Sequence, residues 1–143
     1  MSCTFFGHKD TPDSIKEELR RAIFQLIDEQ GEREFYVGND GRFDHLVQRL
    51  LQEIAEARKD VVFSVVLSRI NEAVVSGYQE KSMFPEEMET VPYRFAIAKR
   101  NEWMIAHSTY AIVYMRHESS NCAKWVDRAI KKGLWVRNLA KEG

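Results

Sequence analysis

The chain has 143 residues, a length that suits one domain. Its 21 basic and 22 acidic residues give a formal net charge of -1. We therefore do not expect nucleic acid as a partner, because proteins that bind it carry a clear basic excess. The apolar share of 44% excludes an intrinsically disordered chain.

The two cysteines, Cys3 and Cys122, are too few for a disulfide-rich secreted scaffold. The first residues lack the basic and apolar regions of a signal peptide. No apolar run approaches the roughly 20 residues of a membrane span. We therefore expect a cytoplasmic protein that does not associate with membranes.

The first half of the chain alternates short apolar runs with amphipathic segments. The run from Cys3 to Phe6, closed by Gly7, predicts a buried strand. Apolar residues then recur at helical spacing from Thr11 to Gln30, where Gly31 ends the predicted helix. The next predicted elements are a strand at Glu34–Val37, a helix at Phe43–Arg58 and a strand at Val61–Leu67.

The stretch from Ser68 to Pro92 interrupts this alternation. It carries Gly77, Pro85 and an acidic run at 86–89, and long connections of this kind are often functional loops. We expect a short helical turn within residues 70–76. The remaining predicted elements are a helix at Tyr93–His107, a strand at Tyr110–Met115, a helix at Cys122–Lys132 and a strand at Leu134–Leu139.

Strands and helices therefore alternate along the whole chain. Such connections are right-handed crossovers that place helices on both faces of a parallel sheet. We predict a single Rossmann-like three-layer α/β/α domain, residues 1–143, with a mainly parallel five-stranded sheet. Ligands of such domains bind beyond the carboxyl ends of the strands, so the loops at that edge are the candidate site.

The loop after the second predicted strand, Gly38-Asn39-Asp40-Gly41, leads into a helix. Free backbone N–H groups at the positive end of a helix dipole form an anion site. In this interpretation Gly38 lets a ligand approach the backbone, and Gly41 permits a left-handed turn. The alternative is an ordinary turn at the end of a strand.

Two further features carry polar groups to the same edge. Ser119-Ser120-Asn121 precedes a predicted helix and offers either a second phosphate cradle or a simple helix cap. Arg100 lies in an otherwise apolar helix, where it is usually a salt-bridged or solvated side chain. If that helix begins near the ligand edge, its guanidinium can bind a phosphate or carboxylate through two hydrogen bonds.

Several stretches resemble the YpsA-like branch of the SLOG superfamily, namely C-T-F-F-G-H-K-D, F-Y-V-G-N-D-G-R-F-D, E-T-V-P-Y-R-F-A-I-A-K-R-N-E-W-M-I and the loop after the fourth strand. SLOG groups Rossmann-like domains related to the Lonely Guy phosphoribohydrolases and DNA-processing protein A. The resemblance covers nearly the whole chain and implies a nucleotide or nucleotide-derived ligand at the carboxyl edge. The positions that match its motifs are Gly7, His8, Gly38, Asn39, Gly41, Asp44 and Arg100.

The chain departs from this pattern after the fourth strand. Many relatives carry two glycines where this chain has Ser120 and Asn121. The phosphoribohydrolases follow these glycines with a catalytic glutamate, whose position falls on Asp127, an exposed helix charge in the alternative interpretation. Binding or sensing of a nucleotide-like ligand is the predicted function. Hydrolysis of a nucleoside 5′-monophosphate at the N-glycosidic bond is the alternative, with Arg100 holding the phosphate and Asp127 stabilising the ribosyl centre.

Other uses of these residues stay open. A metal site would draw on histidines and carboxylates of the loops, but no closely spaced histidine pair is present, so we predict neither a metal nor a cofactor. Trp103 and Met104 are candidates for a homo-oligomer contact or for the core. The acidic run at 86–89 is a candidate cover over the ligand. The residues considered for a metal were His8, Asp10, Asp44, His45, His117 and Glu118.

Overall fold

The computed structural model of the protein describes residues 2–74, 78–116 and 121–141. Each strand and helix predicted from the sequence is present. The strand at Glu34–Val37 has the predicted bounds, the others have shifted ends, and the helix expected after Pro92 begins with a short 3-10 turn at Tyr93–Phe95. The elements are β1 (Cys3–Gly7), α1 (Lys16–Gln30), β2 (Glu34–Val37), α2 (Arg42–Ala57), β3 (Val62–Val66), β4 (Ser82–Met83), α3 (Ala96–Ala106), β5 (Tyr110–Tyr114), α4 (Asn121–Lys131) and β6 (Trp135–Asn138).

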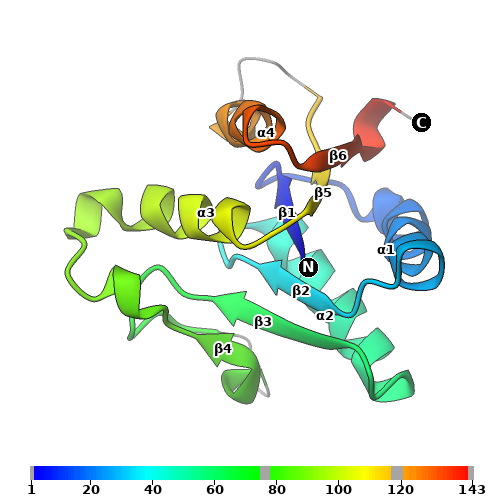
Figure 1. Ribbon diagram of the computed structural model, residues 1–143, viewed down its shortest axis with the longest axis horizontal. Helices are drawn as coiled ribbons and strands as arrows, with labels where there is room; N and C mark the ends of the chain where they lie inside the picture. Colours follow the sequence, from blue (N-terminus) through cyan, green and yellow to red (C-terminus); the bar gives the residue numbers. More distant parts are fainter. Residues whose placement is uncertain (1, 75–77, 117–120, 142–143) are drawn as a thin grey trace.

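The sheet has six parallel strands among the described residues, in the order β4-β3-β2-β1-β5-β6 (Figure 1). The predicted number of five was wrong because β4 lies within the connection that follows β3. Ser82 pairs with Val65 and Met83 with Val66. A strand of two residues has no periodic pattern by which the sequence could reveal it.

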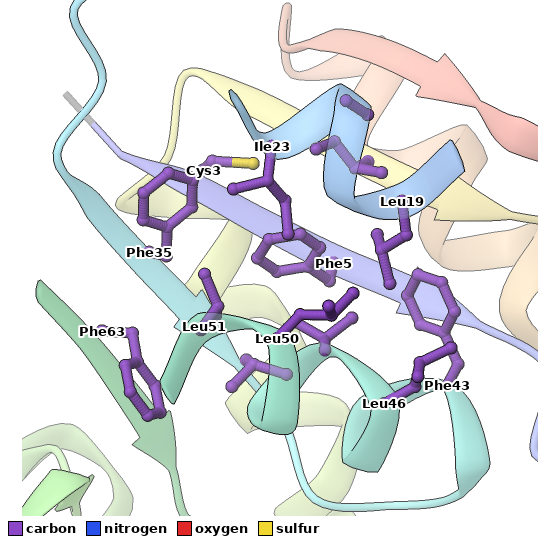
Figure 2. Close-up of a cluster of buried hydrophobic side chains, with 14 of the residues drawn as sticks. Cys3, Phe5, Leu19, Ile23, Phe35, Phe43, Leu46, Leu50, Leu51 and Phe63 are labelled. Carbon is purple, nitrogen blue, oxygen red and sulfur yellow. The ribbon is translucent and has the colours of Figure 1, made fainter. Parts of the chain in front are cut away.

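The helices pack on both faces of this Rossmann-like α/β sheet. Residues of α1 and α2 form one apolar cluster with β1, β2 and β3, and Figure 2 shows Phe5 and Phe35 of the sheet within it. Residues of α3 and α4 form a second cluster with Phe6. Phe5 and Phe6 are neighbours on β1 and point to opposite faces, as the pleat of a strand requires.

The chain reverses its direction of travel across the sheet next to β1. It runs from β1 outward through β2, β3 and β4, and then returns to place β5 on the other side of β1. Gly7 at the end of β1 is level with Tyr114 at the end of β5. The loops that follow these two strands therefore flank the point at which such sheets bind ligands.

Two local predictions differ from the structure. Gly41 was expected to adopt a left-handed turn, but its φ is -178°, which is extended backbone open to any residue. The positive-φ glycines of the described chain are Gly31 and Gly133, each just after a helix. Within residues 70–74 the chain forms a hydrogen-bonded turn at 70–71 in place of the expected helical turn, and residues 75–77 lie outside the described part.

Candidate functional site

A cavity of about 600 Å³ opens at the carboxyl edge of the sheet, beside the reversal between β1 and β5. This volume lies in the range of small-molecule sites. The loop after β1, the start of α2, the inner side of α3 and the amino end of α4 form its walls. The loop after β1 contributes Gly7 to Asp10, and the β2–α2 loop with the start of α2 contributes Asp40, Gly41, Phe43 and Asp44. Arg94 comes from the 3-10 turn before α3, and Ile97, Ala98, Asn101 and Met104 come from α3 itself. The amino end of α4 contributes Asn121, Cys122, Lys124 and Trp125, and Phe5 and Phe6 of β1 complete the wall.

The wall combines three kinds of surface. Aromatic and apolar side chains come from the sheet and from three helices, including Phe6, Phe43 and Trp125. Positive charge comes from lysines and an arginine, and negative charge from aspartates. This mixture suits a ligand that has a flat apolar part and also bears charged or hydroxyl groups. The charged residues are Lys9, Arg94, Lys124, Asp10, Asp40 and Asp44.

Arg100 lies beneath the cavity and does not line it. Its side chain is 0% exposed. Nε–H donates to Asn101 Oδ1 at 2.9 Å, Nη1 donates to the Val66 carbonyl at 3.1 Å, and Nη2 donates to an Asp40 carboxylate oxygen. A ligand in the cavity does not reach this fully buried guanidinium, which is absent from the wall. Arg100 therefore supports the β2–α2 loop from below, a role that depends on residues far away in the sequence.

Asp44 belongs to the first turn of α2 and lines the cavity. Its Oδ2 accepts the backbone N–H of Asp40 at 2.9 Å. Burial raises the pKa of Asp44 to about 6, and the charges of Asp40 and Glu72 act in the same direction. The Arg100 charge and the Asp40 N–H oppose this rise. A carboxyl group that changes protonation near neutral pH is thus placed at the ligand edge.

The glycines of the two loops let side chains and backbones pack closely. A Cβ at Gly7 would lie 2.3 Å from the Phe43 ring, and one at Gly41 would lie 2.7 Å from Lys9 Cα. A Cβ at Gly38 would lie 3.0 Å from Asp44 Oδ2 and 3.1 Å from Arg100 Cζ. Gly38 thus makes room for this carboxylate and guanidinium, and it is absent from the cavity wall.

Asn39 ties the β2–α2 loop to the segment after β3. Its Nδ2 donates to the Ala73 carbonyl at 2.7 Å, and its Oδ1 accepts Gln48 Nε2 at 3.1 Å. Gln48 is fully buried and also donates to the Gly38 carbonyl at 2.9 Å. Asn39 therefore holds the loop in place, and it is absent from the cavity wall, where a ligand contact was predicted.

His8 and Asn121 both line the cavity, as predicted for ligand-binding residues. His8 Nε2 accepts the backbone N–H of Arg116 at 2.8 Å, which leaves the imidazole proton on Nδ1 in the neutral ring. Nδ1 lies 3.6 Å from Cys122 Sγ. Ser119 and Ser120, also predicted to bind the ligand, lie outside the described residues. Cys122 was not predicted, because only the fold brings it beside His8.

Asp127 does not line the cavity. It is exposed on α4 and forms an ion pair with Lys131 Nζ at 3.0 Å. The cavity wall takes Asn121, Cys122, Lys124 and Trp125 from the same helix, but not Asp127. Its geometry matches the alternative interpretation, a solvated helix charge, and gives no support to a catalytic role.

Met104 lines the cavity, whereas the other predicted features lie elsewhere. Met104 is buried, and the half-buried Trp103 donates from Nε1 to Glu87 at 3.1 Å, which holds the acidic run beside α3 and off the cavity wall. Among the described residues, no group of three or more His, Cys, Asp or Glu side chains is arranged to hold a metal ion. His117 and Glu118 are not among them. The helices of the described ranges are too short or too polar to cross a bilayer.

No protein-family model matches the chain, and no curated protein matches it. The resemblance to the SLOG superfamily therefore stays a prediction from the sequence motifs.

Proposed function

We propose that the cavity binds a nucleotide or a nucleotide-derived ligand that bears a phosphate group. The observation that carries this proposal is the composition of one cavity wall at the reversal between β1 and β5. Aromatic side chains, lysines and carboxyl groups share that wall, and the amino end of α4 begins there. Each kind of group has a counterpart in a nucleotide.

The counterparts follow from elementary chemistry. A planar base packs favourably against aromatic rings such as Phe43 and Trp125. An anionic phosphate is stabilised by Lys9 and Lys124 and by the dipole at the amino end of α4. Lys124 also lies with its Nζ 5.0 Å from the Trp125 ring centroid, so a cation and an aromatic face are adjacent on this wall. Carboxylate groups in the loops that follow β1 and β2 can accept hydrogen bonds from the ribose hydroxyls.

Calorimetric titration with the four common nucleoside 5′-monophosphates, and with the matching nucleosides, tests this function. We expect at least one nucleotide to bind and its nucleoside to bind more weakly. Lys124→Ala should weaken binding about tenfold, the effect of losing one charge-assisted contact. Lys132→Ala is the matched control, because Lys132 is exposed just after α4 and does not line the cavity. Absence of binding, or equal effects of the two variants, would refute the proposal.

Hydrolysis of the N-glycosidic bond is the second candidate, and Asp44 is the observation in its favour. The residues first assigned to this reaction, Arg100 and Asp127, are absent from the cavity wall. Asp44 does line the cavity, and its pKa is raised to about 6. In this version Asp44 protonates the leaving base and water attacks the ribosyl carbon. Chromatography of nucleoside monophosphates after incubation should show free base with the wild type and Asp127→Asn, and none with Asp44→Asn.

A further inference from the structure

Among the described residues, Asp44 uses one of its two carboxylate oxygens for a hydrogen bond. Oδ2 accepts the backbone N–H of Asp40 at 2.9 Å. Oδ1 makes no hydrogen bond to the residues that the structure describes. It is not among the buried atoms that lack a hydrogen-bond partner, so it is accessible to solvent. Because the residue lines the cavity, Oδ1 is the oxygen that a ligand can contact.

The charges around Asp44 come from three parts of the chain. Arg100 on α3 favours the ionised form, whereas Asp40 in the same loop and Glu72 after β3 disfavour it. Burial has a larger effect than these charges, and the pKa of Asp44 is raised to about 6. The guanidinium is also engaged by Asp40, so it is not a dedicated partner of Asp44. The other titratable or charged side chains on the cavity wall are His8, Lys9, Asp10, Arg94, Cys122 and Lys124.

A phosphate-bearing ligand changes this balance in one direction. It displaces water from the cavity, and loss of hydration penalises a carboxylate more than a neutral carboxyl group. It also brings negative charge near a group that is already close to its titration point. Both effects favour the protonated side chain in the complex.

We propose that ligand binding is coupled to the uptake of one proton by Asp44, whose Oδ1–H then donates a hydrogen bond to an acceptor atom of the ligand. Ring nitrogens and carbonyl oxygens of nucleobases are acceptors of the required kind. The proton comes from solvent, and no covalent bond of the ligand breaks in this step. The inference rests on the proposed function, because it concerns how the same cavity recognises its ligand.

The expected signature is a specific pH dependence. Above pH 6 the protonated fraction of free Asp44 falls about tenfold per pH unit, so affinity should fall with the same slope and level off below pH 6. Asp44→Asn offers an amide N–H at the position of Oδ1–H and a carbonyl oxygen for the Asp40 N–H at every pH. This variant should keep the low-pH affinity of the wild type and lose the part of the pH dependence that comes from Asp44.

Calorimetric titration with nucleoside 5′-monophosphates at pH 7.5, in buffers of different ionisation enthalpy, counts the protons taken up. We expect nearly one more proton for the wild type than for Asp44→Asn. The phosphate itself titrates near pH 6, but it does so with both proteins, and the difference between them isolates Asp44. Asp10→Asn, which alters another carboxyl group of the wall, should keep the uptake.

The outcomes separate the two proposals. Equal proton uptake by wild type and Asp44→Asn, or weaker binding by Asp44→Asn at every pH, overturns the inference and leaves nucleotide binding intact. Absence of nucleotide binding by the wild type at every pH overturns the proposed function and the inference with it. If Asp44→Asn does not fold, carboxyl carbon NMR of the wild type decides, because added nucleotide should raise the pKa of Asp44 above 6. An unchanged or lowered pKa would contradict the inference.

Discussion

Arg100 and Asp40 are sixty residues apart in the sequence and form an ion pair beneath the cavity. The guanidinium is fully buried on α3, whereas the Asp40 side chain is 26% exposed and lines the cavity. The pair joins the helix to the β2–α2 loop, and the same loop supplies the N–H that anchors Asp44. The stability of the fold and the geometry of the candidate site therefore depend on one buried contact.

Replacement of Arg100 by methionine should destabilise the protein strongly. It leaves the Asp40 carboxylate, which is 26% exposed, and the buried Val66 carbonyl without their donor. Breaking a fully buried pair in this way costs about 3–5 kcal/mol, which sets the upper end of the expected loss. Urea denaturation measures the loss. Arg128→Met is the matched control, because Arg128 pairs with Glu102 at 3.1 Å on the surface, and it should change stability by less than about 1 kcal/mol. Similar losses for both variants would show that the buried pair has no special role.

The sequence predicted the sheet, the helices and the edge at which the cavity lies, because these follow from apolar periodicity and from crossover connections. It could not predict the position of Arg100, since the partner that decides its role is far away in the chain. It also could not distinguish a left-handed glycine from one required by close packing, as at Gly41. Helical spacing alone could not separate Asp127 from Lys124, because residues three apart share a face of a helix. The cavity wall, which takes Lys124 and Trp125 but not Asp127, is set by how α4 packs on the sheet.

Asp44→Asn should stabilise the protein at neutral pH. The pKa of Asp44 in the folded state, about 6, lies above its ordinary value of 3.8. Its contribution to stability is therefore fully present below pH 3.8 and is lost as the pH rises through 6. This loss amounts to about 3 kcal/mol, which the neutral amide avoids.

Urea denaturation of Asp44→Asn and the wild type at pH 7.5 and pH 3.5 tests this sign. The variant should gain stability at the higher pH and little or none at the lower one. Asp127→Asn is the control, since an exposed carboxylate should show no such dependence on pH. A destabilisation by Asp44→Asn that is equal at both pH values would contradict the expected pKa.

Gly7→Ala should disturb the cavity wall through Phe43. The added methyl group would lie 2.3 Å from the ring, and Phe43 is buried in the cluster shown in Figure 2. Overpacking of this kind costs about 1–3 kcal/mol. Combining it with Phe43→Leu should cost less than the sum of the two single changes, because the smaller side chain leaves room. Strict additivity of the two losses would show that the ring does not confine position 7.

Thiol labelling should report occupancy of the cavity. Cys3 is fully buried, and burial raises its pKa well above the ordinary value, so its thiol should stay unreactive while the protein is folded. Cys122 is 8% exposed and lines the cavity beside His8, so we expect reagents that enter the cavity to reach it. Ellman's reagent should therefore modify Cys122 first, and Cys122→Ser should abolish the labelling of the folded protein.

A bound nucleoside monophosphate should slow the reaction of Cys122 by at least about tenfold at saturation, because the reagent reacts only when the ligand is absent. Labelling that is indifferent to nucleotide would place the ligand away from the amino end of α4, and labelling of Cys3 in Cys122→Ser at native stability would contradict the burial of β1.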